Sequence, residues 1–326
     1  MAKAKVVVSR KPPGPALSKL FEQCDTWMWE EDRACPRDLL LEKLKQADGL
    51  YTMIPDQINP DLLAAAPKLR VVSTMAVGVD NIDVKACTAR GIPVGYTPGV
   101  VTEATADLAF ALILAVSRRI VDAANLVRAG EWKVWSPTLM ISNDVFGKTL
   151  GIFGMGRIGQ SIAKRARGFD MPVLYHNRNR SPEAEQAVGA QYRTFDDLLA
   201  QSDIVCVNAP MTPETKQKFN IDAFRKMKRE AFFVNVARGG LVQHAELHQA
   251  LNEGLIKAAA LDVTDPEPIP PDHPLRTNPK CMIIPHVGTC TWETRGRMTQ
   301  ISVDNLLLGL EGKPMLHCVN AEQLKN

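Results

Sequence analysis

Several features that would assign this 326-residue sequence to a special class of protein are absent from it. The formal net charge is only +3, which is too small to indicate binding to nucleic acid or to a membrane surface. The most apolar stretch, residues 104–116, carries Asp107 and is too short to span a bilayer. Residues 1–8 lack the long apolar segment of a secretory signal, so we expect a cytoplasmic protein.

The cysteines also lack any organised pattern. There are seven of them, they are scattered along the chain, and none forms a CxxC pair. An odd number of dispersed cysteines argues against a disulfide framework and against a zinc site. We therefore expect reduced thiols and no bound metal.

What the sequence does contain is an alternation of short apolar runs with helical patterns, which is typical of α/β folds with parallel sheets. Its length suggests two domains rather than one. In the first part of the chain, the pattern predicts strands at 6–8, 49–54, 69–74 and 92–96 and helices at 14–23, 37–46 and 82–90. A long helix is expected from Thr102, with an interruption at residues 117–119.

The rest of the chain continues in the same way. Strands are predicted at 149–153, 172–175, 204–207, 231–236, 258–263 and 282–284, with helices at 160–168 and 291–310 and a short polar tail at 319–326. We expect two doubly wound parallel-sheet domains, in which a Rossmann domain for NAD(P), residues 101–289, is inserted into a flavodoxin-like domain. The latter would comprise residues 1–100 and 290–326 and bind the substrate.

A glycine motif, Gly154-Met155-Gly156-Arg157-Ile158-Gly159, lies directly between a predicted strand and a predicted helix. In such a motif the first glycine permits a sharp turn, the second lets the backbone approach a pyrophosphate, and the third lets the helix pack on the strand. The N-terminus of the helix adds free N–H groups and the positive end of its dipole. A GxGxxG alone is a weak signal, but this context predicts a dinucleotide site.

The acidic residue that NAD-selective Rossmann domains place after their second strand is missing. The sequence reads Asn177-Arg178-Asn179-Arg180 instead. Arginine pairs with phosphate through a planar, bidentate contact, so Arg178 and Arg180 favour NADP(H) as cofactor, with NAD(H) as a possible second one. The alternative is that both are ordinary solvated loop arginines.

Three polar residues follow predicted strands, at the edge where open parallel sheets bind ligands. Arg238 follows the strand at 231–236, Glu267 lies in a proline-rich loop, and His286 follows the strand at 282–284. Each alone is compatible with a structural or solvated role. Together they supply a cation for a carboxylate, a proton donor and an acid that tunes this donor. Reduction of a 2-keto acid with a nicotinamide cofactor requires these groups.

With these motifs the chain resembles the D-2-hydroxyacid dehydrogenase family, and most closely its glyoxylate/hydroxypyruvate reductase branch. The resemblance extends from about residue 45 to about residue 315 and depends on four ordered motifs, at 154–159, 235–239, 261–268 and 285–289. It implies an NADPH-preferring enzyme, a homodimer, that reduces small 2-keto acids. Glyoxylate would yield glycolate, and hydroxypyruvate would yield D-glycerate.

The resemblance also implies roles for the three polar residues. His286 would protonate the carbonyl oxygen of the substrate, and Glu267 would keep His286 protonated through its negative charge. Arg238 would bind the substrate and polarise its carbonyl group. The backbone N–H groups of Val77 and Gly78 would receive the carboxylate.

Further residues are expected around the two ligands. Ile54 and Trp135 would narrow the substrate pocket, and Trp135 would come from the partner subunit. The alternative for Trp135 is burial within its own subunit. The residues expected to contact the cofactor are Gly154, Gly156, Arg157, Ile158, Gly159, Asn177, Arg178, Arg180, Pro210, Val236, Asp262 and Gly288.

Two alternative functions stay open. A related dehydrogenase for a larger keto acid would share every motif above. A protein of a different class, a corepressor-like scaffold that senses the cofactor, keeps the same arginine, glutamate and histidine. That scaffold favours NAD(H) and usually carries a long disordered tail, so the arginine pair favours the enzyme.

Overall fold

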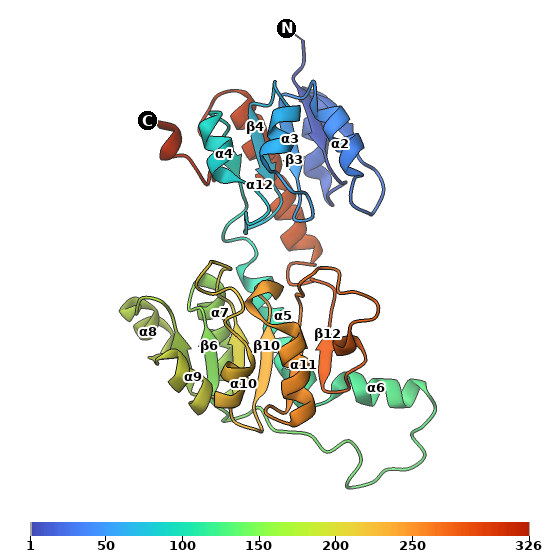
Figure 1. The fold of residues 1–326 in the computed structure, drawn as a ribbon, viewed down its shortest axis with the longest axis vertical. Coiled ribbons are helices and arrows are strands. Elements are labelled where there is room, and N and C mark those ends of the chain that lie inside the picture. Colours follow the sequence, from blue (N-terminus) through green and yellow to red (C-terminus); the bar gives the residue numbers. More distant parts are fainter. Residues whose placement is uncertain (1, 326) are drawn as a thin grey trace. The chain divides into compact units, whose positions relative to one another are not determined.

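The structure is a computed structural model that describes residues 2–325. Contacts divide the chain into two compact units, a discontinuous unit of Met1–Val101 with Thr289–Asn326 and an inserted unit of Thr102–Gly288. Each unit is a parallel sheet covered by helices (Figure 1). The predicted α/β class with two doubly wound sheets is confirmed. None of the helices within residues 2–325 is long and apolar enough to cross a membrane.

The discontinuous unit has its strands in the order β2-β1-β3-β4-β5, which is the flavodoxin-like order. The strands are β1 Lys5–Val8, β2 Asp25–Met28, β3 Gly49–Thr52, β4 Val71–Thr74 and β5 Val94–Gly95. Its helices are η1 Pro15–Leu17, α1 Ser18–Gln23, α2 Arg37–Leu44, α3 Pro60–Ala65, α4 Val84–Ala89, α12 Trp292–Leu310 and η5 Gln323–Lys325. The long helix α12 packs against β3 and β4, which places the C-terminal helix in this unit.

Two elements of this unit were not predicted. β2 is an edge strand whose residues are half-buried or exposed, so it lacks the apolar run of the central strands. α3 is short, but it has a clear start signal. The side chain of Asn59 accepts a hydrogen bond from the Leu62 N–H, and Pro60 occupies the first turn.

The predicted polar tail at 319–326 is wrong for its first residues. Asn320 is only 1% exposed, and its side chain bonds to the backbone at the first residue of β5 and just before it. Its Oδ1 accepts from the Val94 N–H at 2.9 Å, and its Nδ2 donates to the Ile92 carbonyl at 3.0 Å. This short segment is therefore part of the packed unit. The sequence did not show this, because the buried side chain is a hydrogen-bonded amide and not an apolar residue.

The inserted unit has the strand order β12-β11-β10-β9-β6-β7-β8. Counted from β6, this is the Rossmann order with one more strand at the edge. The strands are β6 Leu150–Phe153, β7 Val173–His176, β8 Gln191–Tyr192, β9 Ile204–Val207, β10 Phe232–Asn235, β11 Ala258–Leu261 and β12 Cys281–Ile283. The helices are α5 Thr102–Ser117, α6 Ile120–Arg128, α7 Arg157–Ala166, η2 Arg167–Phe169, α8 Pro182–Val188, α9 Phe195–Gln201, α10 Ile221–Lys226, η3 Gly239–Leu241, α11 His244–Glu253 and η4 Pro274–Arg276.

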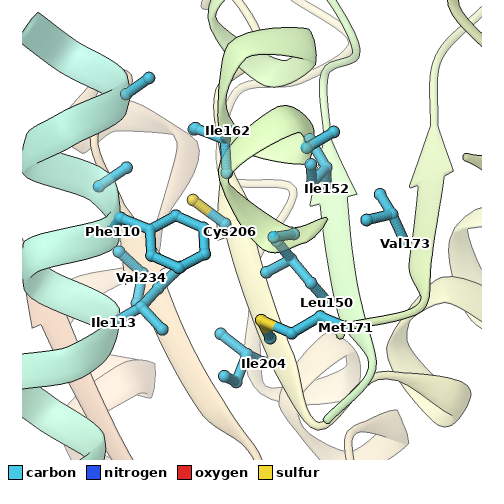
Figure 2. Packing of buried hydrophobic residues seen from close by; sticks show 14 of the residues in the cluster. Phe110, Ile113, Leu150, Ile152, Ile162, Met171, Val173, Ile204, Cys206 and Val234 are labelled. Carbon is cyan, nitrogen blue, oxygen red and sulfur yellow. The ribbon is translucent and has the colours of Figure 1, made fainter. Parts of the chain in front are cut away.

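A buried apolar core lies under α5, next to the helix that follows the glycine motif. Phe110 and Ile113 point from α5 toward the sheet, where they lie near Cys206 of β9 and Val234 of β10 (Figure 2). Ala106 and Ala109 are fully buried on the same helix, and α5 packs closely on α7. Arg119, with φ of +52°, lies between α5 and α6, which accounts for the predicted interruption.

Candidate active site

The glycine motif has the geometry of a phosphate-binding turn. Gly154 has φ of +105°, and a Cβ there would collide with the backbone of Asn208 and Ala209. A Cβ on Gly159 would collide with the Gly154 carbonyl. Gly156 differs, because a Cβ there would meet no atom within 4 Å. The outer glycines are thus required by packing, whereas Gly156 faces open space.

Gly156 is also the N-cap of α7, and its residue type provides no side chain to cap the helix. The first N–H groups of α7 are therefore available to an anion. An open approach at Gly156 and uncapped N–H groups beside exposed Arg157 fit the pyrophosphate of a dinucleotide.

Asn177 connects the glycine turn to the end of β7. Its Oδ1 accepts a hydrogen bond from the Met155 N–H at 2.7 Å, and the Gly154 N–H donates to the His176 carbonyl at 3.0 Å. Sequence reasoning assigned Asn177 only to the cofactor. The structure adds a supporting role, since its carbonyl oxygen holds the turn.

The two arginines after β7 have different surroundings. The guanidinium of Arg180 makes a bidentate pair with Glu185, with Nε–Oε1 at 2.7 Å and Nη2–Oε2 at 2.8 Å. This pair, together with the Tyr175 hydroxyl, lowers the pKa of Glu185 to about 2. Arg178 is exposed, and its charge helps to lower the pKa of Glu214, although the Thr212 hydroxyl contributes more. A phosphate would have to displace Glu185 from Arg180, whereas Arg178 is not held by such a pair.

His286 and Glu267 form a direct pair. The distance from His286 Nδ1 to Glu267 Oε1 is 2.5 Å, and both side chains are partly exposed. His286 has φ of +50°, and its N–H donates to the carbonyl of Asp262. The turn that follows β12 therefore presents the ring of His286 to the Glu267 loop.

The carboxylate of Asp262 fixes this turn. It is almost completely buried at the end of β11, and burial raises its pKa despite the donors around it. Oδ1 accepts from the Val287 N–H at 2.7 Å, and Oδ2 accepts from the Gly288 N–H at 3.0 Å. The side chain of Asp262 thus holds the backbone of Gly288. This contact comes in addition to the position near the cofactor that the sequence predicts for both residues.

Arg238 lies in the turn after β10. The buried side chain of Asn235 shapes this turn, since its Nδ2 donates to the Arg238 carbonyl and its Oδ1 accepts from the Ala237 N–H. A Cβ on Gly239 would collide with the carbonyl of Thr264, so the turn packs directly on the chain that leads to Glu267. Sequence reasoning did not predict the role of Asn235, although an asparagine that ends a buried strand is a usable signal.

The inserted unit therefore brings its three catalytic candidates to one edge. Arg238, Glu267 and His286 follow β10, β11 and β12, which are neighbours in the sheet. Pro210 and Val236 follow β9 and β10 at the same edge. A separate cavity of about 640 Å³ lies near the amino ends of β10–β12, away from these residues. Among residues 2–325, no cluster of three or more His, Cys, Asp or Glu side chains is arranged to hold a metal ion.

The expected substrate residues of the discontinuous unit also share an edge. Ile54 follows β3, and Val77 and Gly78 follow the neighbouring β4. Ile54 is 37% and Val77 is 39% exposed, although both are apolar. In the inserted unit, Trp135 lies in the segment after α6 and is 75% exposed, so it is not buried in its own subunit.

Comparison with known proteins places the chain among well-defined relatives. Residues 110–288 match the family described as "D-isomer specific 2-hydroxyacid dehydrogenase, NAD binding domain". A glyoxylate reductase of Aeropyrum pernix is 44% identical, covering 100% of this chain and 98% of that protein. A glyoxylate reductase of Korarchaeum cryptofilum is 43% identical, covering 99% and 98%.

Solved structures agree with these relatives. The TT0316 protein of Thermus thermophilus superposes with a TM-score of 0.92 at 43% identity, covering 97% of this chain and 99% of that one. An NADPH-dependent glyoxylate/hydroxypyruvate reductase of Sinorhizobium meliloti, in complex with NADP and malonate, superposes with a TM-score of 0.84 at 31% identity. That alignment covers 99% of this chain and 98% of the other.

Proposed function

Because this chain belongs to the D-isomer specific 2-hydroxyacid dehydrogenase family and is thus an NAD(P)-dependent oxidoreductase, we propose that it reduces glyoxylate, and also hydroxypyruvate, with NADPH. The observation that carries this proposal is the pair of His286 and Glu267 at 2.5 Å, in the segments that follow β12 and β11, together with Arg238 in the turn after the next strand of the sheet, β10. The names of the glyoxylate reductases and of the NADP-bound relative support the substrate and the cofactor.

The residues divide the chemistry as follows. His286 donates a proton from Nε2 to the carbonyl oxygen, while Glu267 holds Nδ1 and stabilises the charged ring. The guanidinium of Arg238 binds the keto acid and polarises its carbonyl, and the N–H groups of Val77 and Gly78 bind its carboxylate. When bound, the nicotinamide cofactor supplies the hydride.

Other residues are assigned to the parts of the cofactor. The N–H groups at Gly156, Arg157 and Ile158 hold the pyrophosphate, and Arg178 binds the 2′-phosphate. The turn residues Pro210, Val236, Asp262 and Gly288 border the nicotinamide half.

One steady-state experiment tests the proposal. Initial rates are measured with glyoxylate, hydroxypyruvate and a bulky 2-keto acid, each with NADPH and with NADH. We expect the highest kcat/KM for the two small acids with NADPH. A higher value for the bulky acid would favour the related dehydrogenase instead, and the absence of turnover with every pair would contradict the proposed reaction.

The pairing of Glu267 with His286 gives a prediction about the reaction rate. In Glu267→Gln the partner of the ring carries no negative charge, so the charge-assisted contact with Nδ1 is lost. The kcat for glyoxylate reduction should therefore fall by roughly ten- to a hundredfold, since such a contact contributes about 1.5–3 kcal/mol. Steady-state kinetics of both proteins at saturating glyoxylate and NADPH provide the measurement. If the two kcat values coincide, Glu267 does not assist the proton donor.

The segment around α6 gives a prediction about assembly. α6 has no buried residue, and α6 with the loop after it extends away from the sheet of the inserted unit (Figure 1). Large apolar side chains are exposed along this segment, namely Ile120, Val121, Val127, Trp132, Val134, Trp135, Leu139, Ile141 and Phe146. Many exposed large apolar side chains in one segment indicate an interaction site. We propose that a second copy of the chain covers it and that Trp135 reaches the partner's substrate pocket.

Sedimentation at micromolar concentration should therefore give a dimer for the wild type and a monomer for Val127→Glu. Trp135→Ala should raise the KM for glyoxylate. Lys164→Ala on α7, outside this segment, serves as the control for the dimer. A monomeric wild type would rule out the homodimer.

A further inference from the structure

We infer that Asp56 and Asn81 are positioning residues that lock together the two loops carrying Ile54, Val77 and Gly78, and that this lock sets the affinity for the keto acid. The inference depends on the proposed function, in which these loops bind the substrate. Neither Asp56 nor Asn81 has a role in the reaction as described above. Both are polar side chains that are only 8% exposed.

One carboxylate oxygen of Asp56 accepts three hydrogen bonds. Its Oδ2 accepts from the Ser9 hydroxyl at 2.5 Å, from the Thr52 hydroxyl at 2.8 Å and from the Met53 N–H at 3.0 Å. Ser9 directly follows β1, and Thr52 is the last residue of β3. One buried carboxylate thus joins two strand ends to the first residue of the loop that carries Ile54.

Asn81 joins this loop to the next one. Its Nδ2 donates to the Asp56 carbonyl at 2.7 Å and to the Met53 carbonyl at 3.2 Å. The backbone carbonyl of Asn81 accepts from the Ile58 N–H at 2.9 Å. Since Asn81 ends the loop that contains Val77 and Gly78, these bonds fasten that loop to residues 53–58.

The other end of the Val77 loop is fastened to the same place. The Met75 N–H donates to the Thr52 carbonyl at 3.1 Å. Residues 76–80 therefore lie between two anchors, both of which attach to the end of β3 or to the turn after it. Val77 lies between these anchors, and Ile54 lies between Met53 and Asp56, the two residues to which the Asn81 side chain bonds.

This arrangement matters for binding because backbone N–H groups have no side-chain freedom with which to find a ligand. They bind a carboxylate well only when the loop already points them correctly. If the loop has to become ordered when the ligand binds, the cost of that ordering lowers the affinity for the ligand. The lock should therefore act on the KM for the keto acid, whereas the cofactor cradle is built from β6 and α7 of the inserted unit.

The test compares Asn81→Ala with Asn320→Ala in the full-length enzyme with NADPH. Asn320 is also a buried asparagine of the discontinuous unit, but its bonds go to the chain around β5. Asn81→Ala should raise the KM for glyoxylate roughly three- to tenfold, as expected for lost hydrogen bonds, with kcat and the KM for NADPH nearly unchanged. Asn320→Ala should lower the melting temperature to a similar extent and leave the KM for glyoxylate unchanged.

Ser9→Ala is a milder second variant, because it removes one of the three donors to Asp56 and leaves the loops intact. It should raise the KM for glyoxylate about twofold. An unchanged KM in both Asn81→Ala and Ser9→Ala, or an equal rise in Asn320→Ala, would overturn the inference.

Val77→Pro distinguishes a wrong positioning role from a wrong proposed function. Proline has no N–H, so this change removes one of the groups assigned to the carboxylate of the keto acid. If it raises the KM for glyoxylate while Asn81→Ala and Ser9→Ala do not, only the positioning role is wrong. If the KM is unchanged in Val77→Pro as well, the proposed substrate contact itself is wrong.

Discussion

His286→Ala is expected to lower kcat for glyoxylate reduction by about 10²–10⁴-fold, the usual contribution of general acid catalysis. The reason is that His286 is the proton donor in the proposed reaction, and its ring is held by Glu267 at 2.5 Å. Binding of NADPH should be retained. The turn that carries His286 is fixed by backbone bonds to Asp262, which do not involve the ring.

Two measurements check this prediction, kcat at saturating glyoxylate and NADPH affinity by fluorescence titration. His248→Ala is a matched control, since His248 lies on α11 of the same unit and contacts Asn252 and Asn278. It should turn over at nearly the wild-type rate. Near-normal turnover in His286→Ala would end the assignment of the proton donor, and loss of NADPH binding would indicate a structural role for the ring.

The parts of the fold that could be predicted are those whose signal is local. The buried strand β9 begins and ends at the predicted residues, because Ile204–Val207 is a continuous apolar run, as expected for a strand covered on both faces. The order strand, glycine turn, helix around Gly154 is equally local. β2 was missed because an edge strand does not need such a run.

The parts that could not be predicted depend on partners distant in sequence or on competition between partners. Asn81 and Asp56 are polar residues that the fold brings together, and nothing in either neighbourhood indicates that contact. Arg180 illustrates competition. The sequence shows a cation near the phosphate site, but only the structure shows that Glu185 already occupies its guanidinium.

The pairing of Arg180 with Glu185 is the basis of the remaining prediction, which concerns the choice of cofactor. Asn177 stands where an NAD-selective relative places an acid, so no carboxylate at this position repels a 2′-phosphate. Arg178 is the next residue and is exposed, whereas Arg180 would first have to leave Glu185. We therefore expect Arg178 to contribute most of the preference for NADPH.

Arg178→Ala should lower kcat/KM for NADPH by roughly ten- to a hundredfold, because a charge-assisted hydrogen bond contributes about 1.5–3 kcal/mol and each 1.4 kcal/mol is tenfold. The value for NADH should barely change, since NADH has no 2′-phosphate to lose. Arg180→Ala is the matched control and should have a smaller effect, because its guanidinium is paired with Glu185. The measurement is kcat/KM for both cofactors at fixed, saturating glyoxylate. If the two efficiencies fall together in Arg178→Ala, the side chain is structural. In that case Arg178 does not select the cofactor, and if neither efficiency falls it is an ordinary solvated loop arginine.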